Sequence, residues 1–315
     1  MASLICGSVA YDTIMTFDGR FREHILPDQI HMLNVSFLVP GMRREYGGCA
    51  GNIAYTLKML GGDPIVMATV GQDASPYLQY LRDLGIATDF IRTLPEMFTA
   101  QAMITTDLEN NQITAFHPGA MSHSQLQGVQ DALTGGQRPA LGIVAPDSRE
   151  GMLHHARQFA EADIPFIFDL GQAMPLFNGE DLRQFIELAS YVTVNDYEAQ
   201  VLLSRTAWTS AEVAAKVRAF IVTHGERGAS VFAEGKQYAI PAVPAERVVD
   251  PTGCGDAFRG GLLYGIERGM DWETTGRLAS LMGALKIAQQ GPQNHWLSQD
   301  EIGHRFQSAF GYRYS

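Results

Sequence analysis

The sequence predicts an α/β fold, a three-layer α/β/α sandwich with a mostly parallel central sheet and a small β-sheet lid. Two observations carry this prediction. Short apolar runs alternate along most of the chain with stretches of helical periodicity, which is the pattern of a parallel sheet with helices on its faces. Two segments, residues 12–46 and 88–118, interrupt the alternation with strand patterns and hairpin-like turns.

The apolar runs are expected to form the central sheet. PIVMATV at 64–70 and YVTVN at 191–195 are apolar at successive positions, as in a strand buried on both faces. The other strands are expected at 4–11, 141–146, 165–170 and 219–225. Amphipathic stretches lie between them and are expected to be helices, at 52–62, 75–85, 148–162, 180–190 and 210–218.

The two interrupting segments are expected to pair into a small antiparallel sheet. They contain strand patterns such as TIMTFDG and TAQAMITTDLENNQITAFHP. No internal repeat or low-complexity linker separates them from the rest, so they are insertions. The expected division is a core of residues 1–11, 47–87 and 119–315 and a β lid of residues 12–46 and 88–118.

Composition limits the possible partners and the compartment. The chain has 315 residues, and 23 Lys and Arg against 34 Asp and Glu give a net charge of −11. No basic run offsets this charge, so nucleic acid and anionic membranes are not expected partners. Three cysteines without CxxC spacing indicate neither a disulfide framework nor a zinc site. No signal peptide or membrane span is recognisable, and a cytoplasmic location is expected.

The stretch VVDPTGCGDAFRGGLLYGIERG, residues 248–269, places Asp256 among glycines where a helix is expected to begin. The first N–H groups of a helix have no partner within it and carry the positive end of its dipole, so they can hold a phosphate. The same dipole favours an ionised Asp256, which could accept a proton from an attacking hydroxyl. The stretch therefore indicates phosphoryl transfer to an alcohol.

Other glycine motifs do not fit this stretch. The dinucleotide fingerprint needs a glycine at the position of Phe258, and the Walker A pattern GxxxxGK[ST] is absent from the sequence. A glycine-rich helix start with an ordinary capping Asp remains the alternative.

A second glycine stretch, YGGCAGNIAYTLKMLGG at 46–62, supports the functional interpretation. Gly47 and Gly48 precede an expected helix in which Asn52 faces away from the apolar stripe. Backbone groups and the Asn52 amide could therefore hydrogen-bond a polyol. Together the two stretches resemble the two signatures of the ribokinase/PfkB family of sugar and nucleoside kinases. GSVAYD, FHPGAMS, VNDYE and DPTGCGDAFR extend the resemblance over nearly the whole chain, most closely to bacterial adenosine kinases.

The resemblance implies a ribokinase-like fold and a set of residue roles. It implies Asp256 as general base and Gly253, Cys254 and Gly255 as an anion hole. It implies nucleoside contacts from Ser8, Asp12, Ser36, Gly47, Gly48, Asn52, Phe116 and Gln172, with Phe116 stacking on the base. It implies ATP contacts from Asn195, Thr223, Gly225, Gly228 and Gly255, and Mg²⁺ organised through water by Asn195 and Glu198.

The implied reaction is in-line attack of the nucleoside 5′-hydroxyl on the γ-phosphate of Mg-ATP, with lid closure excluding water. For adenosine it gives AMP and ADP, a purine-salvage reaction. A monovalent cation such as K⁺ is common in the family, although no residue pattern here shows one. The resemblance also implies a homodimer through the lid, whose apolar residues include Met32, Leu33, Val35, Phe37 and Leu38.

Each role has a structural alternative. Asp12 could be a turn or cap residue, and Asn195 with Glu198 could be a plain capping box. Phe116 could be lid core, while Gln172 and Ser8 could satisfy local backbone. The adjacent histidines His154 and His155 lack metal-binding spacing.

Two residues depart from the resemblance. Cys254 stands where the family has Ala or Gly, and a low-pKa thiol there would make the site sensitive to oxidation. Ala102 stands where related adenosine kinases tend to carry an aromatic, which leaves base selectivity open. The alternatives in function are a ribokinase-like sugar kinase, a broader nucleoside kinase, and a non-catalytic nucleoside sensor on the same scaffold.

Overall fold

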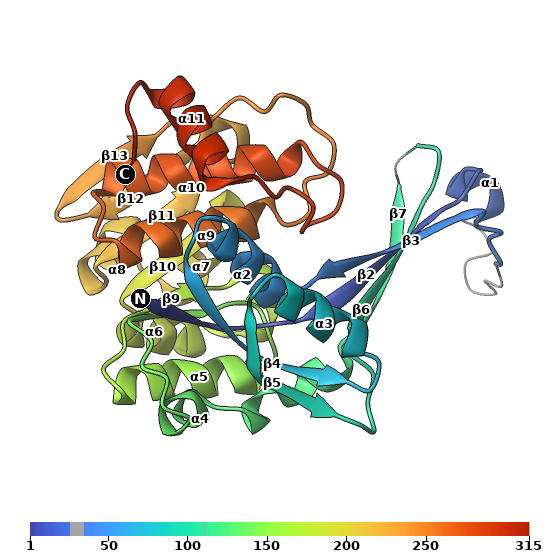
Figure 1. Cartoon of the computed structure of the whole chain (residues 1–315), viewed down its shortest axis with the longest axis horizontal. Helices are drawn as coiled ribbons and strands as arrows, with labels where there is room; N and C mark the ends of the chain where they lie inside the picture. Colours follow the sequence, from blue (N-terminus) through green and yellow to red (C-terminus); the bar gives the residue numbers. More distant parts are fainter. Residues whose placement is uncertain (26–34, 110, 315) are drawn as a thin grey trace.

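The computed structural model describes residues 1–25, 35–109 and 111–314. A nine-stranded sheet with helices on both faces forms the body, and a four-stranded sheet projects from it (Figure 1). This arrangement confirms the predicted three-layer α/β class with a small separate sheet.

The large sheet has the strand order β13-β12-β11-β10-β9-β8-β1-β4-β5. Every neighbouring pair from β5 to β11 is parallel, and only β12 and β13 are added antiparallel at one edge. The sheet is therefore mostly parallel, as predicted. Its strands are β1 (Ala2–Cys6), β4 (Asp63–Gly71), β5 (Ala87–Leu94), β8 (Leu141–Val144), β9 (Phe166–Asp169), β10 (Tyr191–Asn195), β11 (Ala219–Thr223), β12 (Ala229–Ala233) and β13 (Lys236–Ile240).

Two hydrophobic cores cover the two faces of this sheet, because its central strands are apolar on both sides. One core includes α2 (Cys49–Met59), α3 (Ser75–Asp83), α9 (Cys254–Glu267), α10 (Trp272–Ile287) and α11 (Gln299–Phe310). The other includes α4 (Val129–Thr134), α5 (Arg149–Glu161), α6 (Gly179–Leu188), α7 (Asp196–Thr206) and α8 (Ser210–Lys216). Short 3₁₀ helices are η2 (Gly119–Leu126), η3 (Gly171–Leu176) and η4 (Gly225–Arg227). No helix in the described ranges has the length and apolar character to cross a membrane.

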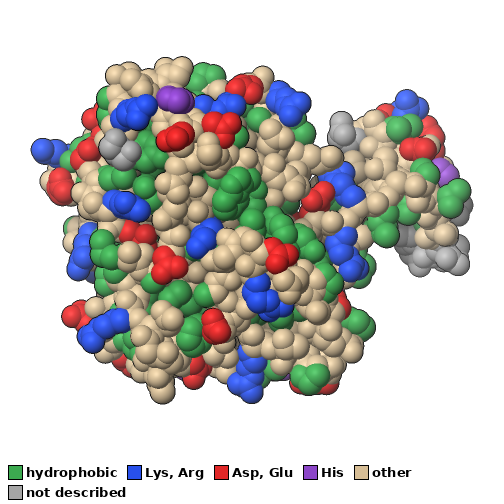
Figure 2. Space-filling model, in the orientation of Figure 1, with side chains coloured by type: hydrophobic (Ala, Val, Ile, Leu, Met, Phe, Trp, Pro, Cys, Tyr) green, Lys and Arg blue, Asp and Glu red, His purple; other side chains and the backbone are tan. Residues whose placement is uncertain are grey.

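The small sheet has the order β3-β2-β6-β7 and forms a separate lobe beside the body (Figures 1 and 2). Its strands are β2 (Ala10–Thr16), β3 (Gly41–Gly47), β6 (Ala100–Thr106) and β7 (Gln112–His117). The outer pairs are antiparallel hairpins, as expected, but β2 and β6 pair in parallel at the centre. β5 belongs to the large sheet, where it pairs with β4, so the expected lid segment 88–118 begins too early.

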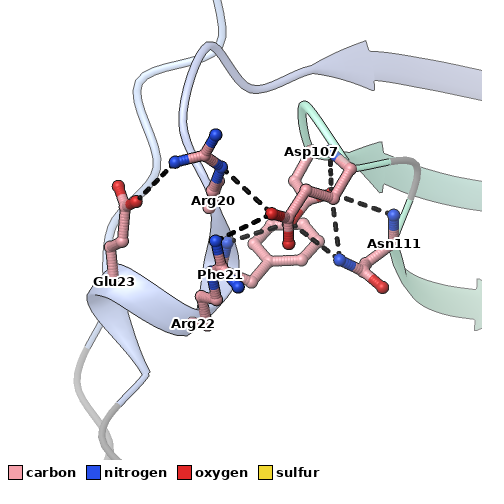
Figure 3. Close-up of polar contacts among 7 residues, drawn as sticks. Arg20, Phe21, Arg22, Glu23, Asp107 and Asn111 are labelled. Atoms are coloured by element: carbon pink, nitrogen blue, oxygen red, sulfur yellow. Dashed lines mark hydrogen bonds and ion pairs between the residues drawn. The ribbon is translucent and has the colours of Figure 1, made fainter.

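Polar contacts join the two hairpins at the tip of the small sheet (Figure 3). The buried carboxylate of Asp107, in the β6–β7 turn, accepts a 3.0 Å hydrogen bond from the N–H of Phe21, the first residue of α1 (Phe21–His24). The same carboxylate accepts a 2.9 Å bond from the N–H of Asn111, which closes the turn. Arg20 forms a local ion pair with Glu23 and a second one, at 3.1 Å, with Glu109 of the β6–β7 turn. Segments far apart in sequence therefore form one lobe.

Candidate active site

The N-terminus of α9 lies beside the carboxyl ends of the parallel strands, the edge where ligands of open α/β sheets bind. Gly253 is the N-cap residue and has a left-handed φ of 80°, which favours glycine. The first α-helical bond of α9 joins the N–H of Ala257 to the carbonyl of Gly253 at 2.9 Å. Cys254, a member of the predicted anion hole, donates its N–H to the carbonyl of Pro251 at 3.2 Å, so that group is already used. The N–H groups of Gly255 and Asp256 precede the first α-helical bond and are available to an anion.

Close glycine contacts position α9 between α2 and α10. A side chain at Gly260 would come within 2.7 Å of Cβ of Thr56 on α2, and one at Gly261 would come within 2.6 Å of Cα of Ala279 on α10. The glycine run after Asp256 thus lets three helices approach closely, and it brings the start of α9 next to α2.

Asp256 is bonded to Asn52 across this helix contact. The Asn52 amide nitrogen Nδ2 donates a 2.7 Å hydrogen bond to Oδ2 of Asp256. The Asn52 oxygen Oδ1 accepts a 2.9 Å bond from Nε2 of Gln293, which also contacts the hydroxyl of Tyr77. Asn52 and Gln293 are buried, so the Asn52 amide is held in a single orientation. The two glycine motifs of the sequence therefore meet at one point.

Burial raises the pKa of the Asp256 carboxyl from 3.8 to about 6, although the Asn52 hydrogen bond opposes this effect. The negative charge of Asp169 raises this pKa further, and the guanidinium of Arg259 lowers it. Arg259 and Asp169 form a buried bidentate ion pair at 2.9 and 3.0 Å, between α9 and the end of β9. Asp256 therefore lies near the buried Arg259–Asp169 ion pair. With a pKa of about 6, its carboxyl is ionised at neutral pH.

Asp12 lies on a face of the small sheet together with Ala102 and Phe116. The strand registers pair Glu45 with Asp12, Asp12 with Ala102 and Ala102 with Phe116. Directly paired residues share a face of a sheet. Burial, and after it the negative charge of Asp256, raise the pKa of Asp12 to about 6. The two carboxylates therefore interact electrostatically. Phe116 is 53% exposed, which excludes the alternative that it is lid core.

The loop after β1 fixes the start of α2. Gly48 is the N-cap residue with φ of 83°, and a side chain there would come within 2.6 Å of the carbonyl oxygen of Ser8. The Ser8 hydroxyl accepts a 3.0 Å bond from the N–H of Cys49, so its side chain caps α2. A side chain at Gly47 would come within 2.5 Å of the Asp12 carboxylate, so Gly47 allows that carboxylate to lie against β3.

Two predicted nucleoside contacts lie farther from this cluster. Gln172 is exposed in η3, after the end of β9. Ser36 is exposed beside Phe37, whose ring packs on Phe17 at 4.8 Å at the outer end of the small sheet. In the described residues, the side-chain hydrogen bond of Asp256 goes to Asn52, and none goes to Ser36 or Gln172.

Asn195 and Glu198 form a capping box at the start of α7. The Asn195 side chain accepts a 2.8 Å bond from the N–H of Glu198, and the Glu198 carboxylate accepts a 2.8 Å bond from the N–H of Asn195. The structural alternative is thus confirmed. Only Oε2 of Glu198 accepts a hydrogen bond from the described residues, which leaves Oε1 without a donor among them. In the described part of the chain, no cluster of three His, Cys, Asp or Glu residues could bind a metal directly.

The predicted ATP loop follows β11, next to β10. Thr223 ends β11, and its hydroxyl donates a 3.4 Å bond to the carbonyl of Val194. Gly225 begins η4 and Gly228 follows it, with φ values of 59° and 93°. A side chain at Gly228 would clash with the Ile240 carbonyl oxygen, so the loop lies close against β13.

The expected low-pKa thiol at Cys254 is wrong. Burial raises the pKa of Cys254 to about 11, and the carboxylates of Asp250 and Asp256 add to the rise, although Lys286 opposes it. Desolvation outweighs the helix dipole here, so the thiol is protonated at neutral pH.

Several residues that shape this site were not predicted from the sequence. Arg259 lies in the stretch 248–269 and Asp169 lies in the expected strand at 165–170. A charged residue inside an apolar helix or at the end of a buried strand indicates a buried pair. Gln293, Tyr77 and Lys286 gave no such local signal, because their partners are remote in sequence.

Together, a helix N-terminus able to hold a phosphoryl group and a hydrogen-bonded carboxylate beside it define the class of site that phosphotransferases use. The family model for pfkB family carbohydrate kinases matches residues 9–299. The chain belongs to this family.

The similar proteins cover almost the whole chain. A Burkholderia thailandensis nucleoside kinase solved in complex with inosine has 58% identity and a TM-score of 0.89 over 99% of both chains. The same protein in complex with ADP-inosine has 60% identity and a TM-score of 0.87, over 99% of this chain and 97% of that one. A nucleoside kinase of Methanocaldococcus jannaschii is 30% identical over 87% of this chain and 89% of its own length.

Proposed function

We propose that the chain is an ATP-dependent nucleoside kinase that transfers the γ-phosphate of Mg-ATP to the 5′-hydroxyl of a nucleoside. The observation that carries the proposal is the 2.7 Å bond between Asn52 and Asp256 at the N-terminus of α9. Family membership and the inosine complex of the Burkholderia protein support the reaction class and the acceptor.

In the proposed reaction Asp256 takes the proton of the attacking hydroxyl. Its pKa of about 6 keeps it ionised at neutral pH yet basic enough to share a proton in the transition state. The N–H groups of Gly255 and Asp256 stabilise the negative charge on the transferred phosphoryl group. Asn52 holds the carboxylate in position, and its buried partner Gln293 prevents it from turning away.

ATP is proposed to bind over the ends of β10 and β11, where Thr223, Gly225 and Gly228 supply a tight loop. Mg²⁺ would neutralise phosphate charge and would be held through water by Asn195 and Glu198. Burial raises the pKa of Glu198, while Arg259 and the N–H of Asn195 oppose the rise.

The nucleoside is proposed to lie under the small sheet. Asp12 faces the ribose hydroxyls, with Gly47 and Gly48 beside it, and Phe116 presents an exposed ring to the base. Ser8, Ser36 and Gln172 would complete these contacts when the lobe moves toward the body. Ala102, between Asp12 and Phe116 in the register, leaves space on this face.

We infer that the acceptor range is broad and includes adenosine and inosine. The space beside Ala102 favours a purine nucleoside kinase of relaxed base selectivity over a strict adenosine kinase. A role in purine salvage follows from either product. The free thiols of Cys6, Cys49 and Cys254 suit the reducing cytoplasm proposed for the chain.

A homodimer through the small sheet completes the proposal. The β7 strand is exposed along its length and forms an edge of the sheet. The unpaired backbone groups of such an edge can pair with a partner strand or surface. Leu38 is 87% exposed and can contact a partner. The ring of Phe37 packs on Phe17 and Phe21 in the tip, so Phe37 is not available for such a contact. Met32 and Leu33 lie outside the described residues.

The proposal is tested by ADP release with Mg-ATP and adenosine, guanosine, inosine, cytidine, ribose or fructose as acceptor. We expect the highest kcat/KM with purine nucleosides. Turnover with ribose or fructose alone would assign a sugar kinase and would remove the role of Phe116. Nucleoside binding without turnover on any acceptor would assign a sensor instead.

A further inference from the structure

A buried lysine holds the loop that precedes the anion-binding end of α9. Lys286, near the end of α10, has no exposed surface. Its ammonium nitrogen Nζ donates hydrogen bonds of 2.7 Å to the carbonyl of Asp250 and 3.1 Å to the carbonyl of Gln289. It forms no ion pair with a carboxylate of the described residues. A charge that is buried without a carboxylate partner is costly, so it needs an explanation.

The two carbonyls belong to segments that meet around the start of α9. The Asp250 carboxylate accepts 2.9 Å bonds from the N–H groups of Thr252 and Gly291. The bond from Gly291 is a second link between the loop before α9 and the segment after α10. The carbonyl of Ile287 accepts bonds of 2.9 and 3.2 Å from the N–H groups of Val249 and Asp250. Lys286 is thus at the centre of a junction between the end of α10 and the loop that leads into Gly253.

We infer that the Lys286 ammonium is a built-in cation that positions this loop, and with it the phosphoryl-binding N–H groups of α9. Backbone carbonyls turned toward one point are the ligands that a compact monovalent cation such as K⁺ takes. Here the protein supplies the positive charge itself. Lys286 is a positioning residue, because it acts through the loop and contacts no reacting atom.

The neighbourhood favours this role. Cys254, the first residue of α9, has its thiol 3.9 Å from the Asp250 carbonyl that Lys286 holds. The backbone carbonyl of Cys254 also lies 3.6 Å from the position that a side chain at Gly283 of α10 would occupy, so α10 packs directly on the start of α9. Displacing the Asp250 carbonyl therefore moves the residues that begin the helix. The inference rests on the proposed kinase reaction and replaces the K⁺ expected from the family resemblance.

The test compares wild type, Lys286→Ala and Lys286→Met in KCl, NH₄Cl and tetramethylammonium chloride at constant ionic strength. Turnover is measured with the acceptor that wild type uses best, and Mg-ADP affinity is measured by calorimetry on the same samples. Thermal unfolding checks that each variant is folded. Lys286→Met keeps the long stem without the charge, so it separates charge from packing.

We expect wild-type kcat to change less than about twofold between the salts. Lys286→Ala should lose about tenfold or more in kcat in tetramethylammonium, which is too large for the space, and should recover saturably with K⁺ or NH₄⁺. Lys286→Met should stay low in every salt, because its stem fills the space that the ion would need.

Three results would overturn the inference: a wild type that requires K⁺ or NH₄⁺, a folded Lys286→Ala that no cation restores, or a Lys286→Met with wild-type kcat. If Lys286→Ala does not fold, the Lys286→Met and wild-type results decide the matter. A wild type that turns over no acceptor would refute the proposed function. In that case the Mg-ADP affinity still tests the role of Lys286. The affinity should be weaker in Lys286→Ala and should return with K⁺, and an unchanged affinity would overturn the inference.

Discussion

The Asn52 amide of α2 and the Asp256 carboxylate of α9, separated by 204 residues in sequence, are joined by a 2.7 Å hydrogen bond. Neither helix alone could orient this carboxylate. Because Gln293 fixes the other end of the amide, the bond sets the direction of the proposed general base, and it lowers a pKa that burial raises.

Replacing Asp256 by Asn should reduce kcat by a factor on the order of 10² or more, because the amide cannot accept the proton of the attacking hydroxyl. Nucleoside affinity, measured by calorimetry, should stay within a few fold of wild type. The exposed Asp89→Asn, in β5, is the matched control and should leave kcat unchanged. Wild-type turnover in Asp256→Asn would remove Asp256 from the reaction.

The pH profile of kcat/KM should fall as the pH drops below about 6. Burial raises the pKa values of Asp12 and Asp256 to about 6, and both carboxylates must be ionised to act as proposed. Because two groups titrate, log kcat/KM should rise with pH at a limiting slope of two on the acid side. Asp12→Asn should reduce this slope to one. Both enzymes are measured with the same Mg-ATP, so titration of the phosphates cancels. An unchanged slope in the variant would exclude Asp12.

The acid limb of the pH profile is the decline of kcat/KM below about pH 6. Substitutions of two neighbours of Asp256 should move this limb in opposite directions. Asn52→Val removes a hydrogen bond that stabilises ionised Asp256, so the pKa rises and the limb moves to higher pH. Asp169→Asn removes a nearby negative charge, so the pKa falls and the limb moves to lower pH. Shifts of the same sign in the two variants would contradict the electrostatic account of this site.

Asp256→Asn should also stabilise the protein at neutral pH. The pKa of Asp256 is about 6 in the folded protein against an ordinary 3.8, so the folded state binds more protons between these values. The contribution of this group to stability is therefore larger at acid pH and declines as pH rises through about 6. Urea unfolding at pH 7.5 should show the variant about 1 kcal/mol more stable, with no gain near pH 4. A variant less stable at pH 7.5 would contradict this reasoning.

Phe116→Ala should raise the KM for a purine nucleoside about tenfold while changing kcat little, because base stacking contributes mainly to binding. Ile113, on the same strand, lies on the opposite face because strand residues alternate, so Ile113→Ala is the control. Both side chains are exposed, so neither change should unfold the lobe. An equal rise of KM in both variants would argue against stacking.

Much of the fold was predictable because the parallel strands are apolar on both faces and the helices carry clear periodicity. β12 and β13 escaped prediction, because they form an edge hairpin whose half-buried residues resemble a loop. β5 was assigned to the lid because its mixture of half-buried and exposed residues resembles that of the true lid strands. A strand at the edge of a large sheet and one in a small sheet carry the same pattern.

The site was predictable in parts. The two glycine stretches are local signals, and the structure brings Asn52 and Asp256 into contact. Local sequence could not show that Lys286 reaches the carbonyl of Asp250, since that contact depends on how two segments meet. The Cys254 thiol was misjudged because its pKa is dominated by burial, which the sequence does not reveal.

The central claim is transfer of a phosphoryl group to a nucleoside hydroxyl. The most direct measurement is phosphorus-31 NMR of wild type with Mg-ATP and adenosine. We predict equal amounts of ADP and adenosine 5′-monophosphate, with no inorganic phosphate. ADP with inorganic phosphate, or unchanged ATP in the presence of bound adenosine, would contradict the assignment.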